Sequence, residues 1–381
     1  MAQCSSNNGG TDQVLVEETG SVRTFILNRP NQLNALSFRM ISRLTELFYA
    51  SEEDPNVKMI ILKGHRRAFC AGGDVSIFFQ NPGNWKIGAN FLQKQYTLNY
   101  VMATYSKTQV SILNGIVMGG GAGASIHGRF RVATEKSVFA MPETDLGHFP
   151  DVGASYFLSR LPGFFGEYAG LTGSRLDGAE MLACGLATHF VSSDKLPLLE
   201  QALVKVNTSN PDAISAIISC FSNMPKLKEE SPYHKMKIIN HCFSRRTIEE
   251  IISTLESEAL DKKDDWISST IQTLKKASPT SLKISLRSIR EGRLQDISCC
   301  LVREYRMACH LLRGEFSKDV VEGYRAIFID KDRNPKWEPS RLELISDDDV
   351  DRYFSKIDAE DWEDLKLPPR SNMHPYAIAK L

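Results

Sequence analysis

Between residues 12 and 190, the chain alternates two patterns of apolar and polar positions. Val22 to Leu27 and Met59 to Leu62 are short runs of the kind typical of buried strands. Phe38 to Ser51 and Phe91 to Ser106 instead place apolar residues at helical spacing. Strands that alternate with helices in this way predict an α/β fold.

From about residue 195 onward, the pattern becomes helical and densely charged. Glu249 to Leu260 is its clearest amphipathic stretch. Just before this region, we expect a helix that starts at Asp177, stops at Gly185 and leads into a short strand. The acidic run beginning at Asp347 is most simply a solvated helix start. The sequence therefore predicts a second, helical region with a boundary near residue 200.

The composition changes this picture little, but it excludes some functions. The 381 residues are 42% hydrophobic and 24% charged with a formal net charge of zero, enough for one large domain plus a smaller one. A neutral chain gives no support for a nucleic-acid partner, and no run approaches the roughly 18 apolar residues of a membrane span. Eight cysteines without CxxC or zinc-type spacing predict reduced thiols and no metal site.

Two glycine-rich segments follow strand-like runs. AFCAGGD spans Ala68 to Asp74, and NGIVMGGGAG spans Asn114 to Gly123. A helix that starts after such a turn presents unpaired N–H groups, which suit an oxyanion or a phosphate. The second segment formally fits the dinucleotide fingerprint, but Glu135 comes too early to be its acid. Tight packing of a strand against a helix is the alternative for either turn.

The loop from Phe139 to Gly153 places the carboxylates of Glu143 and Asp151 eight residues apart, among glycines and prolines. Such a pair can transfer protons and handle water. An acid pair in a loop is also often solvated or a helix cap. The two glycine turns upstream favour catalysis, since their N–H groups could converge on one oxygen atom beside the acids.

The segments AFCAGGD, NGIVMGGGAG and MPETDLGHFPDVG, in this order and spacing, resemble the crotonase (enoyl-CoA hydratase/isomerase) superfamily. The PETxxGxFPDVG loop and the ending IDKDRNPKW are similar to its 3-hydroxyisobutyryl-CoA hydrolase branch, above all the plant peroxisomal form. The resemblance implies a spiral of ββα units with two perpendicular sheets, followed by a helical C-terminal region. The implied parts are a flexible N-terminal arm at 1–11, the crotonase-like core at 12–200, the helical region at 201–366 and a tail at 367–381.

The same resemblance assigns roles to five residues. Gly73 and Gly120 match the oxyanion-hole positions, whose N–H groups polarise a thioester carbonyl. Glu143 matches a catalytic carboxylate that acts either as a nucleophile or as a base on water. Asp151, the acid specific to this branch, is assigned to water positioning or proton delivery and to holding the substrate's 3-hydroxyl. Gln95 either contacts the acyl hydroxyl or is solvated on an amphipathic helix.

The implied activity is hydrolysis of 3-hydroxyisobutyryl-CoA, and of related 3-hydroxyacyl-CoA thioesters, to the free acid and CoA in valine catabolism. Coenzyme A is then part of the substrate, no separate cofactor is expected, and a homo-oligomer stays open. One alternative is a hydratase or isomerase, but superfamily hydratases carry a second Glu at the position of Gly123. The other is a catalytically silent acyl-CoA binding protein, which would need no acid pair.

Other residues near these motifs carry further expectations. His148 stands where relatives usually have an apolar residue, and we expect a surface-pointing imidazole; an effect on the acid pair or the acyl pocket is the alternative. Cys70 is expected to be a small buried residue rather than a nucleophile. Coenzyme A should meet the backbone of residues 32–34 and 70–72, with Arg29 either contacting a phosphate or supporting the turn.

The last three residues, Ala379, Lys380 and Leu381, resemble the small-basic-Leu peroxisomal address that a receptor reads at a free C-terminus. The start, MAQCSSNNGG, lacks the apolar segment of a signal peptide and the Arg-rich pattern of a mitochondrial presequence. We therefore expect the protein in the peroxisome, with the import receptor as a partner.

Overall fold

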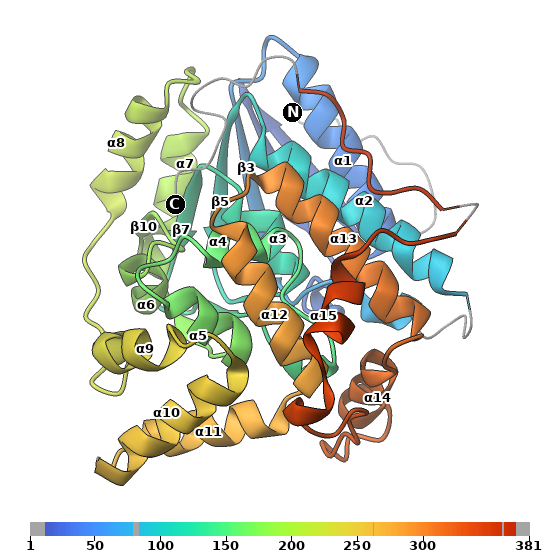
Figure 1. Cartoon of the computed structure of the whole chain (residues 1–381). Helices are drawn as coiled ribbons and strands as arrows, with labels where there is room; N and C mark the ends of the chain where they lie inside the picture. Colours follow the sequence, from blue (N-terminus) through green and yellow to red (C-terminus); the bar gives the residue numbers. More distant parts are fainter. Residues whose placement is uncertain (1–11, 79–83, 262, 360–361, 371–381) are drawn as a thin grey trace.

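The computed structural model describes residues 12–78, 84–261, 263–359 and 362–370, whose arrangement Figure 1 shows. The N-terminal arm expected at residues 1–11 and the expected targeting tripeptide at residues 379–381 lie outside the described residues. Within the described ranges, two β-sheets are surrounded by helices, which confirms the α/β class.

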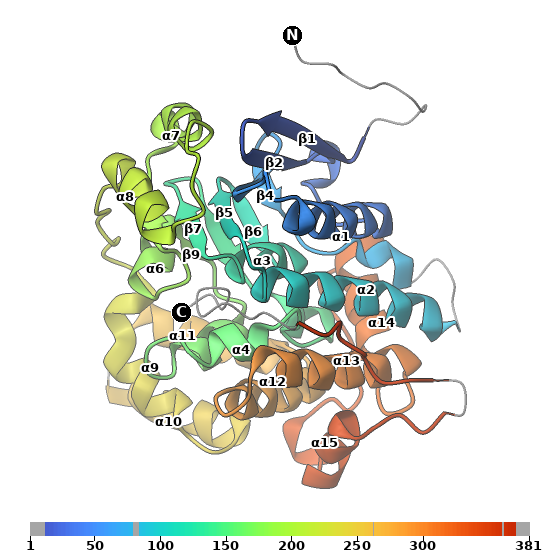
Figure 2. The same cartoon turned by 90° about the horizontal axis from the view of Figure 1, so that it is seen from above.

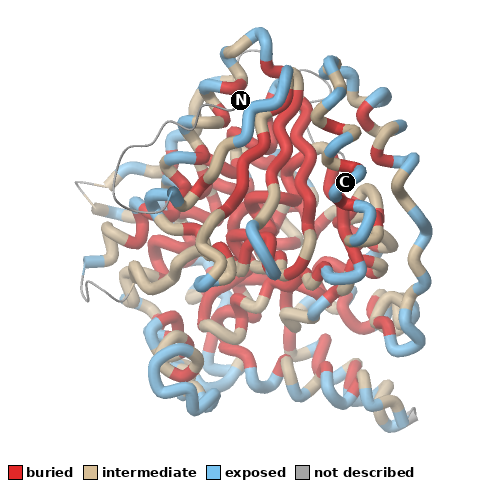
Figure 3. The backbone as a smooth tube through the Cα atoms, turned by 180° about the vertical axis from the view of Figure 1, so that it is seen from behind, coloured by how far each residue is buried: buried red, intermediate tan, exposed pale blue. Residues whose placement is uncertain are grey.

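A six-stranded sheet forms the centre of the molecule, and its buried strands are red in Figure 3. Its strands in spatial order are β1 (Val14–Thr19), β2 (Val22–Leu27), β3 (Met59–Gly64), β5 (Thr108–Leu113), β7 (Phe130–Ala133) and β10 (His189–Phe190). β1 pairs antiparallel with β2, and each later pair is parallel. Both faces of β3 and β5 are covered, which is why these strands appear in the sequence as continuous apolar runs.

A four-stranded sheet carries the loops that the sequence singles out. Its strands in spatial order are β4 (Ala68–Cys70), β6 (Ile116–Met118), β8 (Val138–Ala140) and β9 (Leu176–Asp177). β4, β6 and β8 run parallel, so their carboxyl ends lie at the same edge of the sheet. The first glycine turn follows β4, the second follows β6, and the acid loop follows β8. Pairing of three short strands therefore brings three loops together.

Six helices belong to the first half of the chain. They are α1 (Phe38–Glu53), α2 (Trp85–Ala103), α3 (Gly120–Ile126), α4 (Ala154–Leu158), α5 (Phe165–Thr172) and α6 (Gly178–Ala183). Ser37 caps α1 by accepting the Met40 N–H at 3.1 Å, and Asp177 caps α6 as expected. α2 begins at Trp85 rather than Phe91, because its first turns bury Gly88 and Ala89, small residues that leave no strong apolar signal.

Helices alone follow β10 in the described residues. They are α7 (Leu196–Leu203), α8 (Pro211–Phe221), α9 (Met236–Phe243), α10 (Ile248–Asp261), α11 (Asp265–Lys276), α12 (Pro279–Gly292), α13 (Ile297–Arg313), α14 (Asp319–Tyr324) and α15 (Asp347–Phe354). α7 and α8 pack on the six-stranded sheet in an apolar cluster of their own. The division at residue 200 therefore stays a prediction, since it falls within α7.

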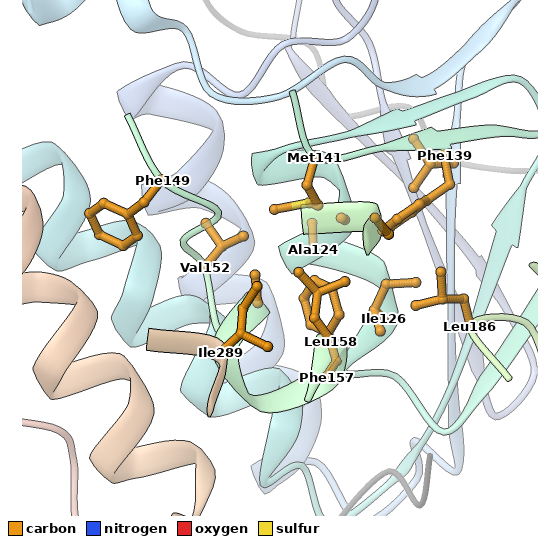
Figure 4. Packing of buried hydrophobic residues seen from close by; sticks show 14 of the residues in the cluster. Ala124, Ile126, Phe139, Met141, Phe149, Val152, Phe157, Leu158, Leu186 and Ile289 are labelled. Carbon is orange, nitrogen blue, oxygen red and sulfur yellow. The ribbon is translucent and has the colours of Figure 1, made fainter. Parts of the chain in front are cut away.

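The later helices of this region reach the loops of the four-stranded sheet. α13 lies along α2 and α12 along α4, and both neighbourhoods can be followed in Figures 1 and 2. α14 packs on the short 3₁₀ helix η3 (Glu143–Leu146), which begins the acid loop. Figure 4 shows Phe149 and Val152 of this loop among buried apolar side chains that include Ile289 of α12. None of the helices in the described ranges has the length and apolar character needed to cross a membrane.

Candidate active site

A cavity of about 400 Å³ lies where the loops after β4, β6 and β8 meet. All five site residues predicted from the sequence line it: Gly73, Gln95, Gly120, Glu143 and Asp151. Val320 and Tyr324 of α14 complete its wall from the helical region. The cavity thus joins residues that are up to 257 positions apart, from Ala71 to Phe328.

The two glycine turns present their backbone N–H groups side by side. Within the described ranges, neither the Gly73 N–H nor the Gly120 N–H donates a hydrogen bond to another backbone group. A Cβ atom built on Gly120 would lie only 2.8 Å from the Gly73 nitrogen, so the two backbones approach each other without a side chain between them. Two neighbouring N–H groups without a backbone acceptor, at the wall of one cavity, are suited to binding an oxyanion.

The side chain of Gln95 lies over both turns. It comes from the middle of α2 and is 2% exposed. Its Oε1 is 3.3 Å from the Cβ position of Gly73, and its Nε2 occupies the space that a side chain at Gly120 would need. The alternative of a solvated Gln95 is therefore wrong, and its contact with an acyl hydroxyl stays a prediction.

Glu143 places a buried carboxylate against the second glycine turn. Its side chain is 8% exposed, and Oε2 has no hydrogen-bond partner in the described structure. Oε1 is 2.8 Å from the Cβ position of Gly119, whose φ of +48° suits glycine. Burial, and then the charge of Asp151, raise the pKa of Glu143 well above that of an ordinary carboxyl group. Such a group is a stronger base than an ordinary carboxylate.

Asp151 is held by a residue that sequence reasoning did not assign. Tyr96, which follows Gln95 on α2, donates its hydroxyl to Asp151 Oδ2 at 2.7 Å. Both side chains are buried. Burial raises the pKa of Asp151, while the charge of His148 and the Tyr96 hydrogen bond lower it. The contact joins positions 55 residues apart, so only its position beside Gln95 could have indicated Tyr96.

The expectation of a surface-pointing His148 is wrong. Its side chain is 8% exposed and lines the cavity. Its Nδ1 donates to the Phe149 carbonyl at 2.8 Å, and its ring stacks on that of Phe149 at 4.7 Å. The loop is covered because Gly147 packs directly on the backbone of Asp319 in α14. The alternative, an effect on the acid pair or the acyl pocket, fits this position.

The space beside Gly123 is filled, which bears on the hydratase alternative. A Cβ atom on Gly123 would lie 2.5 Å from Val152 Cβ and 3.0 Å from Asn99 Nδ2. Val152 reaches this space with a φ of +57°, a conformation that β-branched residues rarely adopt. A second glutamate therefore has no room at Gly123 unless the acid loop changes its path.

Three further expectations concern residues beside the glycine turns: Arg29, the coenzyme A turns and Cys70. Arg29 donates to the Ala35 carbonyl at 2.7 Å and to Asp74 at 3.0 Å, so it supports the turn. The expected coenzyme A turns lie side by side, since the Ala71 N–H donates to the Leu33 carbonyl at 3.0 Å. Burial raises the pKa of the Cys70 thiol to about 12, which leaves almost no nucleophilic thiolate near neutral pH.

Paired N–H donors beside two buried carboxylates define an enzyme that acts on an activated carbonyl. The chain belongs to the enoyl-CoA hydratase/isomerase family, whose model matches residues 22–354. It is 67% identical to 3-hydroxyisobutyryl-CoA hydrolase 1 of Arabidopsis thaliana over 371 residues, covering 97% of this chain and 98% of that one. It is 66% identical to the probable 3-hydroxyisobutyryl-CoA hydrolase 3 of the same plant over 370 residues, covering 96% and 98%.

A solved structure confirms the crotonase-like fold. The crystal structure of a carnitinyl-CoA dehydratase from Mycobacterium thermoresistibile superimposes with a TM-score of 0.85 at 32% identity, covering 94% of this chain and 100% of that one. The helical C-terminal region is thus part of a known arrangement.

The paired glycine donors generate a first prediction. In Gly120→Ala, the added methyl group would lie against the Gly73 nitrogen and Gln95 Nε2, so we expect kcat for thioester turnover to fall about 100-fold, as for loss of one oxyanion donor. Gly185→Ala is the control for replacing a glycine as such: its φ of +87° strains any side chain, but no atom lies within 4 Å of its Cβ position and it does not line the cavity. Gly64 is unsuitable as a control, since a Cβ there would collide with the Ala68 carbonyl. Equal kcat values in the two folded variants would contradict the oxyanion role.

Proposed function

We propose that this protein hydrolyses 3-hydroxyisobutyryl-CoA, and related 3-hydroxyacyl-CoA thioesters, to the free acid and CoA. The observation that carries the proposal is the convergence of the free Gly73 and Gly120 N–H groups with the Glu143 and Asp151 carboxyl groups on one cavity. The two Arabidopsis relatives described above are named as 3-hydroxyisobutyryl-CoA hydrolases, one of them as a probable one, and each matches this chain over almost its whole length. The proposal includes a place in valine catabolism.

In the proposed reaction, the thioester carbonyl oxygen lies between the Gly73 and Gly120 N–H groups. Their dipoles stabilise the negative charge that develops when the carbonyl carbon is attacked. Glu143 then has two routes. It either attacks the carbon and forms an anhydride that water hydrolyses, or it removes a proton from the attacking water. In both routes the C–S bond breaks, and CoA leaves as a thiolate that takes up a proton.

Asp151 serves the same reaction from the other side of the cavity. Its Oδ2 is occupied by the Tyr96 hydroxyl, so Oδ1 is the oxygen left for a water or for the substrate's 3-hydroxyl. The raised pKa of Asp151 suits delivery of a proton to the leaving thiolate. Coenzyme A enters as part of the substrate, and no separate cofactor belongs to this proposal. A homo-oligomer stays a prediction.

The hydratase alternative is less well supported, because the filled space at Gly123 leaves Glu143 without the second glutamate on which hydration depends. The silent binding protein would not explain a buried Glu143 carboxyl with an unpaired oxygen, which costs stability and contributes nothing to binding. Thiol release separates all three functions, since neither hydration nor binding frees CoA.

The second prediction concerns the two acids. With 3-hydroxyisobutyryl-CoA as substrate and a thiol reagent as the probe, wild-type protein should release CoA, and Glu143→Gln and Asp151→Asn should each lose at least 99% of kcat (on the order of 10²-fold, as for general acid–base catalysis). Both substitutions keep side-chain volume, so the thermal midpoint and acyl-CoA binding should stay close to wild type. Wild-type turnover in both variants would rule out the acid-pair mechanism.

The third prediction is a pH dependence. Because Glu143 must be ionised to act, and burial and the Asp151 charge raise its pKa, kcat should fall on acidification at a pH well above the ordinary carboxyl pKa of 4.5. Asp151→Asn removes one of the two causes, so the acid limb of its residual kcat should move to lower pH. A limb that stays in place or moves to higher pH would show that the two carboxyl groups are not coupled.

We further propose that the protein acts in the peroxisome and that Ala379, Lys380 and Leu381 bind the import receptor. The last described residue before this segment in the sequence is Arg370, which forms an ion pair with Glu52 of α1 at 2.7 Å. The fourth prediction is that a fluorescent protein fused to the N-terminus enters peroxisomes, and that removal of residues 379–381 leaves the fusion in the cytosol. Replacing Arg370 by Ala is the control and should not change import. Unchanged import after the deletion would refute this location.

A further inference from the structure

Helix α13 buries a carboxylate that has no part in the cavity. Glu304 is 0% exposed and is not among the residues that line the cavity. Its Oε2 accepts the Gly153 N–H at 2.6 Å. Its Oε1 accepts the Ser155 N–H at 3.0 Å and the Ser155 hydroxyl at 2.6 Å. A side chain 149 residues downstream of Ser155 thus caps the first turn of α4, which begins three residues after Asp151.

This carboxylate is costly for the folded protein. No ion pair in the described structure includes Glu304, and the adjacent Arg303 instead donates to the Ser155 hydroxyl oxygen at 2.8 Å. Burial raises the pKa of Glu304 to about 7, against the lowering effect of its three hydrogen bonds. An unpaired buried carboxylate is expected only where its hydrogen bonds do something that a neutral side chain would not.

The turn that Glu304 holds is strained. Val152 has a φ of +57°, a left-handed conformation that strains a β-branched residue. The turn is fixed from one side by His127, whose Nε2 donates to the Val152 carbonyl at 2.8 Å, and from the other by Glu304. Strain of this kind persists only where the surroundings determine the backbone. Without Glu304, this turn loses the carboxylate that accepts the Gly153 N–H.

The same stretch of α13 also supports the side-chain end of Asp151. Tyr305 follows Glu304 in the sequence, and its ring stands edge-on to that of Tyr96 at 6.3 Å. Tyr96 in turn donates to Asp151 Oδ2. Two consecutive residues of α13 therefore support Asp151. Glu304 holds the backbone turn that follows Asp151, and Tyr305 packs on Tyr96, the hydrogen-bond donor to the Asp151 carboxylate.

We propose that Glu304 is a positioning residue for Asp151: by fixing the turn from Asp151 to Ser155, it sets the direction of the Asp151 carboxyl group in the cavity. This inference rests on the proposed hydrolase function. It also gives the helical region a part in the chemistry, since α13 then orients an acid of the core. A purely structural cap on α4 is the competing explanation.

A double-mutant cycle on thiol release separates the two explanations. Glu304→Gln keeps the shape of the side chain but places an N–H₂ group against the Gly153 or Ser155 donors. We expect kcat to fall at least tenfold with KM changed less than twofold, because Asp151 is turned away while the acyl-CoA site is intact. In an Asp151→Asn background, the same substitution should have almost no further effect on kcat.

Glu167→Gln is the matched control. Glu167 is also 0% exposed, but it lies on α5, pairs with Arg293 at 2.7 Å and does not line the cavity. The Glu167→Gln substitution should lower the thermal midpoint of the protein without changing kcat. Ser155→Ala removes one of the three hydrogen bonds of Glu304, together with the bond that Arg303 donates to the Ser155 hydroxyl. It keeps the test informative if Glu304→Gln does not fold, and it should lower kcat two- to fivefold, again only when Asp151 is present.

The inference is overturned if Glu304→Gln or Ser155→Ala leaves kcat at the wild-type value, or lowers it equally with and without Asp151. Wild-type turnover in Asp151→Asn alone would contradict the proposed role of Asp151 itself, and with it this inference. An additive cycle in which Asp151→Asn is inactive would contradict only the positioning role of Glu304.

Discussion

The site depends on the parallel pairing of three short strands. β4, β6 and β8 end at one edge of the smaller sheet, so the two glycine turns and the acid loop begin side by side. The turns can meet only because Gly120 has no side chain, since a Cβ would lie 2.8 Å from the Gly73 nitrogen. In the described structure neither N–H group has a backbone acceptor, as the proposed oxyanion role requires. The positions of Gln95 and Glu143 follow from the contact between the turns, because both pack directly on the same turns.

Burial then decides what the two acids can do. Burial, and then the charge of Asp151, raise the pKa of Glu143, which makes its carboxylate a stronger base than an ordinary one. Asp151 is fixed by Tyr96 and by a strained turn at Val152, whose side chain fills the space beside Gly123. The backbone conformation at Val152 therefore has two effects. It places Asp151 at the cavity, and it leaves no room for a second glutamate at position 123. The core and α13 hold this conformation together, which links the helical region to the reaction.

The sequence predicts the parts of this account that depend on local pattern. Buried parallel strands give continuous apolar runs, so β2 and β3 could be predicted, and glycine turns after such runs indicate exposed backbone. The roles of the five site residues came from the resemblance to the crotonase superfamily, which local pattern alone would not have assigned. Tyr96 and Glu304 could not be found in either way, because their contacts span 55 and about 150 positions and follow from how helices pack. His148 was misplaced because a polar residue between Gly147 and Phe149 looks exposed until α14 covers the loop. The start of α2 was missed because Gly88 and Ala89 give a weak apolar signal.

The claim that two backbone donors converge on a thioester carbonyl can be measured without turnover. Glu143→Gln should bind 3-hydroxyisobutyryl-CoA without cleaving it, so the stretching frequency of an isotope-labelled carbonyl can be recorded in the complex by infrared difference spectroscopy. Two hydrogen bonds from the Gly73 and Gly120 N–H groups should lower this frequency relative to the free thioester in water. The shift should be largely lost when Gly120→Ala is added. A bound carbonyl that vibrates at the frequency of the free thioester would contradict the account.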